Sequence, residues 1–129
     1  MKFWIAGLLA ALMLTAFGVW AAQPQYLTVD HASEVLMDRA IVKAMWKKEL
    51  PVARLAKLYP VKKWGFASEV EGGFNASNTC VVTARVMLLP LRGKTLSLIP
   101  KKAATAFDTL PGATREQCRE LARKKLEEA

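Results

Sequence analysis

The chain has 129 residues and a formal net charge of +8, from 19 Lys and Arg against 11 Asp and Glu. One His and two Cys exclude a His-ligated metal centre and a four-cysteine zinc site. Any Ser-His-Asp or Cys-His catalytic machinery would have to depend on His31 alone. At about 100–200 residues per domain, the length predicts a single domain.

The N-terminal segment has the features of an export signal. A short basic start precedes an uncharged run from Phe3 to Trp20. Val19 and Ala21 place small residues at the two positions that matter for cleavage. The pattern therefore predicts a signal peptide, residues 1–21, cleaved after Ala21, and a mature domain of residues 22–129.

The alternative is an uncleaved membrane anchor, because the uncharged run approaches the roughly 20 residues that span a bilayer. Cleavage is favoured because the next cationic residue is Arg39, so no stop-transfer cluster follows. The Ala-rich signal indicates a bacterial source and a periplasmic or secreted protein. In such an oxidising compartment, two cysteines predict one disulfide, Cys80–Cys118, rather than two free buried thiols.

Helical periodicity marks the start of the mature chain. Apolar residues recur at spacings of three and four over residues 31–48, which predicts an amphipathic helix with Asp30 as its N-cap. Pro51 interrupts this helix, and a short second helix is predicted to end at Pro60.

The period then changes from 3.6 to 2, which is typical of strands. Ser68 is the one polar residue on the inward side of the first such segment. A tight turn at Arg92–Gly93 is predicted to join the second and third segments. The pattern predicts three strands: one that begins at Trp64 and gives way to a loop or wide turn at residues 72–78, and two more over residues 79–91 and 95–99. Residues 100–112 are predicted to form a loop.

A last helix is predicted from Thr114, because Gln117 follows at the capping-box spacing and Cys118 begins an apolar stripe. The expected fold is therefore α+β. It consists of an N-terminal helix broken near Pro51, a three-stranded antiparallel meander sheet and a C-terminal helix that one disulfide joins to the sheet.

One face of the predicted hairpin carries an apolar patch. The two-residue turn would pair Leu89 with Leu96 and Met87 with Leu98. The candidate interface consists of five apolar residues and a polar rim: Met87, Leu89, Leu91, Leu96 and Leu98, with Arg92 and Lys94. Two alternatives remain open. The helix over residues 31–48 covers the patch in a three-layer sandwich, or the patch meets another chain.

Two acidic residues are the only pairing that suggests catalysis. Glu69 and Glu71 share one strand face at roughly 6.6 Å, a separation found in glycosidases. The more ordinary interpretation is alternating surface charge, with Arg85 as a cross-strand partner for Glu69. His31 would lie on the first helical turn without an orienting partner. The sequence therefore predicts no catalytic residue, no metal and no cofactor.

The basic charge favours an anionic partner such as lipid headgroups, an acidic polysaccharide or an acidic protein. Nucleic acid is not expected for an exported protein, nor is a membrane span after signal cleavage. The leading hypothesis is a small, exported, non-catalytic binding protein of the bacterial envelope, resembling inhibitors or immunity proteins in size and compartment. The alternative is a structural or accessory subunit of an envelope complex. A small periplasmic hydrolase using Glu69 and Glu71 is a distant third, and the oligomeric state stays open.

Overall fold

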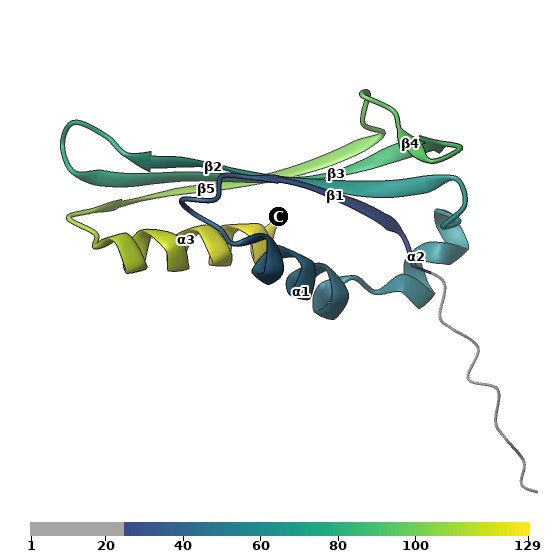
Figure 1. The fold of residues 1–129 in the computed structure, drawn as a ribbon, viewed down its shortest axis with the longest axis horizontal. Helices are drawn as coiled ribbons and strands as arrows, with labels where there is room; N and C mark the ends of the chain where they lie inside the picture. The colour runs from purple at the N-terminus through teal and green to yellow at the C-terminus, as the bar shows by residue number, and fades with distance from the viewer. Residues whose placement is uncertain (1–24) are drawn as a thin grey trace, which may run out of the picture.

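The computed structural model describes residues 25–129 as a mixed sheet with three helices on one of its faces (Figure 1). The predicted signal peptide, residues 1–21, lies outside the described residues. The elements in chain order are β1 (Leu27–Ala32), α1 (Arg39–Glu49), α2 (Val52–Leu58), β2 (Trp64–Phe74), β3 (Thr79–Arg92), β4 (Thr95–Leu96), β5 (Lys102–Pro111) and α3 (Arg115–Glu128).

The α+β class is as predicted, but the three-stranded antiparallel meander is wrong. β1 pairs in parallel with β2, while β2 and β5 each pair antiparallel with the central strand β3. β1 and β5 are thus outer strands, and each has a weaker sequence pattern than the central pair. Ala106 is the only buried residue of β5. The strand therefore lacks the alternation of buried apolar and exposed polar residues by which a half-buried strand is recognised.

The first helix begins later than predicted, at Arg39 instead of residue 31. The cap is Asp38, whose Oδ1 accepts a hydrogen bond from the Ala40 N–H at 2.8 Å. Asp30 satisfies the same residue preference but lies in β1. The predicted break at Pro51 is confirmed, because α1 and α2 end and begin on either side of it.

The predicted register of the third strand is also wrong. β4 pairs Leu91 with Leu96 and Arg92 with Thr95, so the turn lies at Gly93–Lys94. Gly93 has φ +64°, the left-handed conformation that such a turn needs. β4 ends after two residues, because β5 occupies the same edge of β3 from Leu88 onward.

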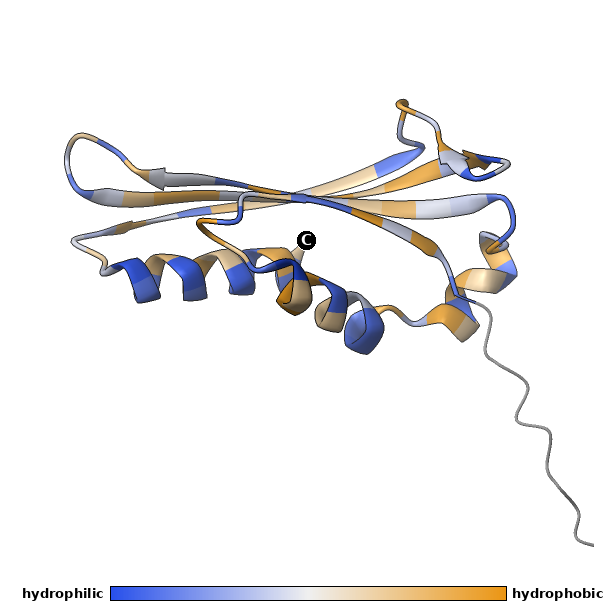
Figure 2. Cartoon of the chain, in the orientation of Figure 1, coloured by the Kyte–Doolittle hydropathy of each residue, from blue (hydrophilic) through white to orange (hydrophobic). Residues whose placement is uncertain are grey.

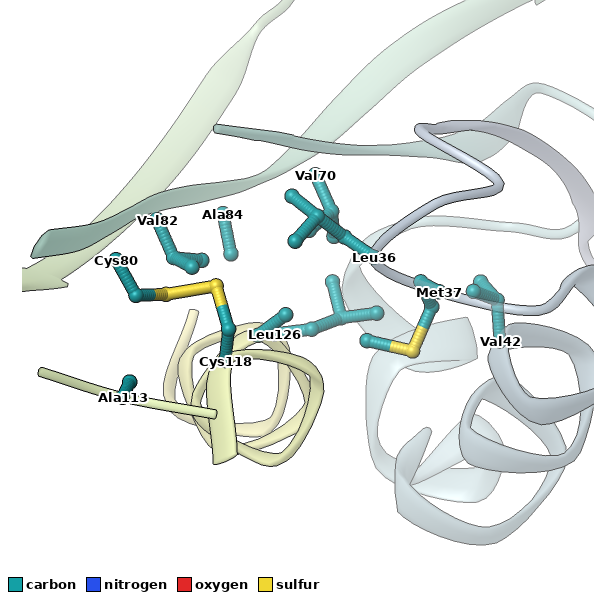
Figure 3. Close-up of a cluster of buried hydrophobic side chains, with 11 residues drawn as sticks. Leu36, Met37, Val42, Val70, Cys80, Val82, Ala84, Ala113, Cys118 and Leu126 are labelled. Atoms are coloured by element: carbon teal, nitrogen blue, oxygen red, sulfur yellow. A yellow bond between two sulfur atoms is a disulfide. The ribbon is translucent and has the colours of Figure 1, made fainter. Parts of the chain in front are cut away.

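The main core lies between the sheet and the two longer helices. Val70, Val82 and Ala84 project from β2 and β3 against side chains from α3 and from the segment that enters α1 (Figure 3). The disulfide Cys80–Cys118 is present, with the two Cα atoms 5.6 Å apart. The capping box of α3 is confirmed as well, because Thr114 and Gln117 exchange hydrogen bonds of 2.8 and 3.1 Å.

A second cluster holds α2 and the start of β1 to the sheet. Tyr26, Phe66 and Leu88 are its buried members, and the Tyr26 and Phe66 rings meet edge to face at 5.0 Å between centroids. The Tyr26 hydroxyl donates to the Tyr59 carbonyl oxygen. Burial raises the pKa of the Tyr26 phenol. This contact ties the end of α2 to the residue that precedes β1.

We expect the Cys80→Ala/Cys118→Ala variant to lose about 4 kcal/mol of unfolding free energy, because the disulfide closes a loop between residues 38 apart in sequence. Urea denaturation followed by circular dichroism measures the loss, with the oxidised wild type as reference. Thiol titration of the unfolded wild type should find no free cysteine, and two free thiols would contradict the assignment.

Candidate interaction surface

The sheet has one face under helices and one face without them (Figure 1). Opposed residues in a sheet share a face, so the register assigns each strand position to one side. Val82 and Ala84 lie under the helices, whereas Met87 and Leu89 belong to the other side, here called the open face. Within residues 25–129 no helix covers the open face, so the predicted three-layer sandwich is wrong.

The predicted apolar patch is on the open face, but it is not one continuous exposed surface. Met87 and Leu89 are buried, together with Ala67, and Val29 and Leu96 pack against them. Leu96 lies over Gly65, where an added Cβ would come within 2.5 Å of the Leu96 Cδ2. The two-residue strand β4 therefore covers part of this face with its own side chain. Leu91 is half-buried at the base of β4.

Leu98 is the only fully exposed apolar residue of the predicted patch, and it lies in residues 92–102, here called the tip. Leu98 is 97% exposed and its neighbour Ile99 is 77% exposed. The tip is held at its base by two backbone hydrogen bonds of 2.8 Å, from Ser97 N–H to the Pro90 carbonyl and from Lys101 N–H to the Leu88 carbonyl. Figure 1 shows the segment between β4 and β5 rising from the sheet on the side away from the helices.

Four cationic residues lie in the same segment as the two exposed apolar residues of the tip. All four are exposed: Arg92, Lys94, Lys101 and Lys102. In Figure 2 the outer end of this segment is orange, for hydrophobic residues, and the part nearer the sheet is blue, for hydrophilic residues. The predicted rim residues Arg92 and Lys94 therefore lie in the same segment as Leu98, although the register that suggested it was wrong. Ile99 and Lys101 belong to this segment as well. Lys102 ends it, and its Nζ turns toward the helices, 5.8 Å from the centroid of the Tyr59 ring.

The open face also carries a row of ionisable residues. His31, Glu69 and Arg85 lie directly opposite one another on β1, β2 and β3, so the predicted position of His31 on a helix is wrong. The register places Glu69 opposite Arg85, as predicted, but the two side chains make no ion pair within 4.0 Å. His31 is exposed, whereas Glu69 and Arg85 are half-buried. Glu71 is exposed opposite Thr83.

Sequence reasoning missed a polar cluster beneath β1. Ser68, fully buried, accepts a hydrogen bond from Trp46 Nε1 at 3.2 Å and donates to Asp30 Oδ1 at 3.4 Å. Asp30 Oδ1 also accepts from the Ala32 N–H at 2.9 Å. The cluster lies at a hollow of about 450 Å³ between β1 and α1, to which Arg39 and Lys43 contribute. Its sequence signal was Ser68 on the inward side of β2. Its other members are 22 and 38 residues from Ser68.

Two of the five cations on α3, Arg123 and Lys125, pair with acidic residues of the same helix. Arg123 holds Glu120 at 2.7 Å and Glu127 at 3.1 Å. The hydrogen bond from Arg123 lowers the pKa of Glu120 below its ordinary value. Arg123 and Lys125 are therefore less available to a partner than the cations of the tip.

Two features are absent from residues 25–129. No cluster of three or more His, Cys, Asp or Glu is placed there to hold a metal ion. None of the helices in that part of the chain is long and apolar enough to cross a membrane.

No family model and no curated protein matches the chain. Among solved structures, the PelC dodecamer from Paraburkholderia phytofirmans is similar at 11% identity and a TM-score of 0.43, covering 83% of this chain and 88% of that chain. A single-residue variant of the same PelC dodecamer is similar at 13% identity and a TM-score of 0.40, covering 82% and 88%. Similarity this low says nothing of what this chain binds.

A pair of substitutions tests the difference between the two faces. We expect Val82→Glu to cost more than about 4 kcal/mol of stability, because it would place an unpaired carboxylate under the helices. Leu96→Glu should cost about 1 kcal/mol, since only a half-buried contact is lost and the carboxylate reaches water. Thermal and urea denaturation measure both. Equal, large losses for the two variants would show that something covers the open face.

Proposed function

We propose that this chain is a small, exported, non-catalytic interaction protein of the bacterial envelope, and that its tip docks onto an anionic lipid surface. The single observation that carries the proposal is the exposure of Leu98 and Ile99 at the end of a segment with four exposed cations. Monomeric domains seldom expose large apolar side chains together at a projecting end unless something binds them.

The composition of the tip fits a membrane surface better than a protein pocket. Lys and Arg near an anionic leaflet each contribute about 1 kcal/mol, and each buried apolar side chain contributes about 1.5–3 kcal/mol. Two apolar side chains and the three cations Arg92, Lys94 and Lys101 therefore support reversible binding that depends on anionic lipid. The same cations would weaken binding at high salt, because exposed charges are screened.

Two other observations support the rest of the proposal. The disulfide Cys80–Cys118 is a bond that persists in oxidising compartments, which agrees with export. The two acidic residues of the hydrolase hypothesis lie on the open face, where Glu69 is half-buried and Glu71 is exposed, and neither lines a cleft in the described part of the chain. A general acid or base normally needs a cleft that perturbs its pKa and orients it toward a substrate.

The proposal predicts that the purified domain co-sediments with vesicles of equal parts phosphatidylglycerol and phosphatidylcholine, and not with phosphatidylcholine vesicles. Leu98→Ser/Ile99→Ser should lower the partition coefficient at least about tenfold, since it removes the apolar anchor. Lys94→Glu/Lys101→Glu should lower it comparably at low salt and less at high salt.

Val35→Ser is the matched control, because Val35 is 70% exposed and lies between β1 and α1, beside Leu36 and Met37 of the core on the helix-covered side. It should leave partitioning unchanged. Equal binding of wild type and the Leu98→Ser/Ile99→Ser variant would overturn membrane docking by the tip. Binding to neither vesicle would favour a protein partner for the same surface.

A second candidate function is that of an accessory subunit in an envelope assembly. The observation that favours it is the uncovered open face together with an exposed outer strand, β5. The inhibitor-like or immunity-like protein of the sequence hypothesis would instead use the same tip to bind a protein, and the vesicle experiment separates the two.

A further inference from the structure

The outer edge of β5 is the longest exposed edge of the sheet. β5 has ten residues, against six in β1, and only Ala106 among its side chains is buried. Within residues 25–129 no strand pairs with its outer edge. An unpaired edge of this length presents a row of backbone donors and acceptors to another strand.

The ladder determines which backbone groups of β5 point outward. The Gly112 N–H donates to the Asn78 carbonyl at 3.1 Å, which extends the β3–β5 register by one pair. Because inward and outward groups alternate in an antiparallel ladder, the odd-numbered residues of β5 point away from β3. The outward donors would be those of Ala103, Thr105, Phe107 and Thr109.

Two features block the end of this row. The Thr109 N–H donates to the carboxylate of its neighbour, Asp108 Oδ1, at 2.8 Å. Pro111 has no N–H at all. The free outward donors are therefore those of Ala103, Thr105 and Phe107. This set is symmetric about Thr105.

We propose that β5 pairs antiparallel with β5 of a second copy of this chain, about a two-fold axis at Thr105. Thr105 would then face its own counterpart, and Ala103 would face Phe107 of the other copy. These three pairs use all the free outward donors and form roughly six backbone hydrogen bonds. Because both copies use the same surface, the contact is closed and would form a dimer.

Side chains match in the same register. Lys102 and Asp108 are both exposed and would lie opposite each other twice, so that each Asp108, which lies 3.6 Å from Lys125 of its own chain, would gain a second cation. Phe107 is 69% exposed on the open face and would pack over the small side chain of Ala103. A register centred on Phe107 would set the two rings against each other and move Lys102 away from Asp108. The pairing goes beyond the proposed membrane docking and does not depend on it.

Cysteine cross-linking tests both the pairing of the two β5 strands and the register of that pairing. Thr105→Cys should form an intermolecular disulfide on mild oxidation, because the Cα atoms of a hydrogen-bonded antiparallel pair are about 5.5 Å apart, within disulfide range. Thr109→Cys is the matched control, with the same residue type on the same edge. In this register its two copies would be separated by roughly 25 Å, so it should stay monomeric on a non-reducing gel.

Charge exchange tests the side-chain match by sedimentation velocity over a range of concentrations. Lys102→Asp should raise the dimer dissociation constant about tenfold, and Lys102→Asp/Asp108→Lys should restore it. Lys47→Asp, an exposed cation on α1, is the control for net charge and should leave it unchanged. Melting curves check that each variant is folded, since Lys102 also lies 5.8 Å from the centroid of the Tyr59 ring.

The proposal is overturned if the wild type stays monomeric at millimolar concentration, or if Thr109→Cys cross-links as readily as Thr105→Cys. Failure of the double charge exchange to restore the dimer would overturn the register. These outcomes are independent of vesicle binding, which concerns the tip.

Discussion

The packing of three helices against a single face of the sheet is the constraint on which the other features depend. Cys80, Val82 and Ala84 on β3 are fully buried there, and the disulfide fixes α3 to the first of them. Since α1 packs on this same side, the described chain has no helix left for the opposite face. Both the open face and the exposed edges follow from that distribution.

The open face is stabilised without a second layer because β4 folds back over it. Gly65 has no side chain, so Leu96 can lie directly above the β2 backbone and help to bury Met87 and Leu89. β4 leaves the edge of β3 after Leu96, where β5 takes over the pairing. The chain between them must then project, and the residues at its end are Leu98 and Ile99. The exposed apolar tip is thus a consequence of two strands sharing one edge of β3.

The sequence located an element correctly where one face of that element is buried and the other is exposed to solvent. Alternation identified β2 and β3, and the Thr114–Gln117 spacing identified the start of α3, because both signals are local. Alternation did not identify the two outer strands, β1 and β5, because few of their side chains are buried in the core. Asp30 and Asp38 fit the N-cap rule equally well, and the choice between them is made by pairing of β1 with β2, a contact some 38 residues away. The row of His31, Glu69 and Arg85 has the same long-range origin.

The two proposed surfaces are compatible in geometry. A two-fold axis perpendicular to the sheet keeps the open faces of both copies on the same side. Both tips would then project in one direction, away from all the helices. Two weak tips that reach one surface together bind more strongly than either alone, since the second contact becomes intramolecular. A tip with only two exposed apolar side chains is suited to that arrangement, because each alone gives reversible attachment and the pair gives a lasting one.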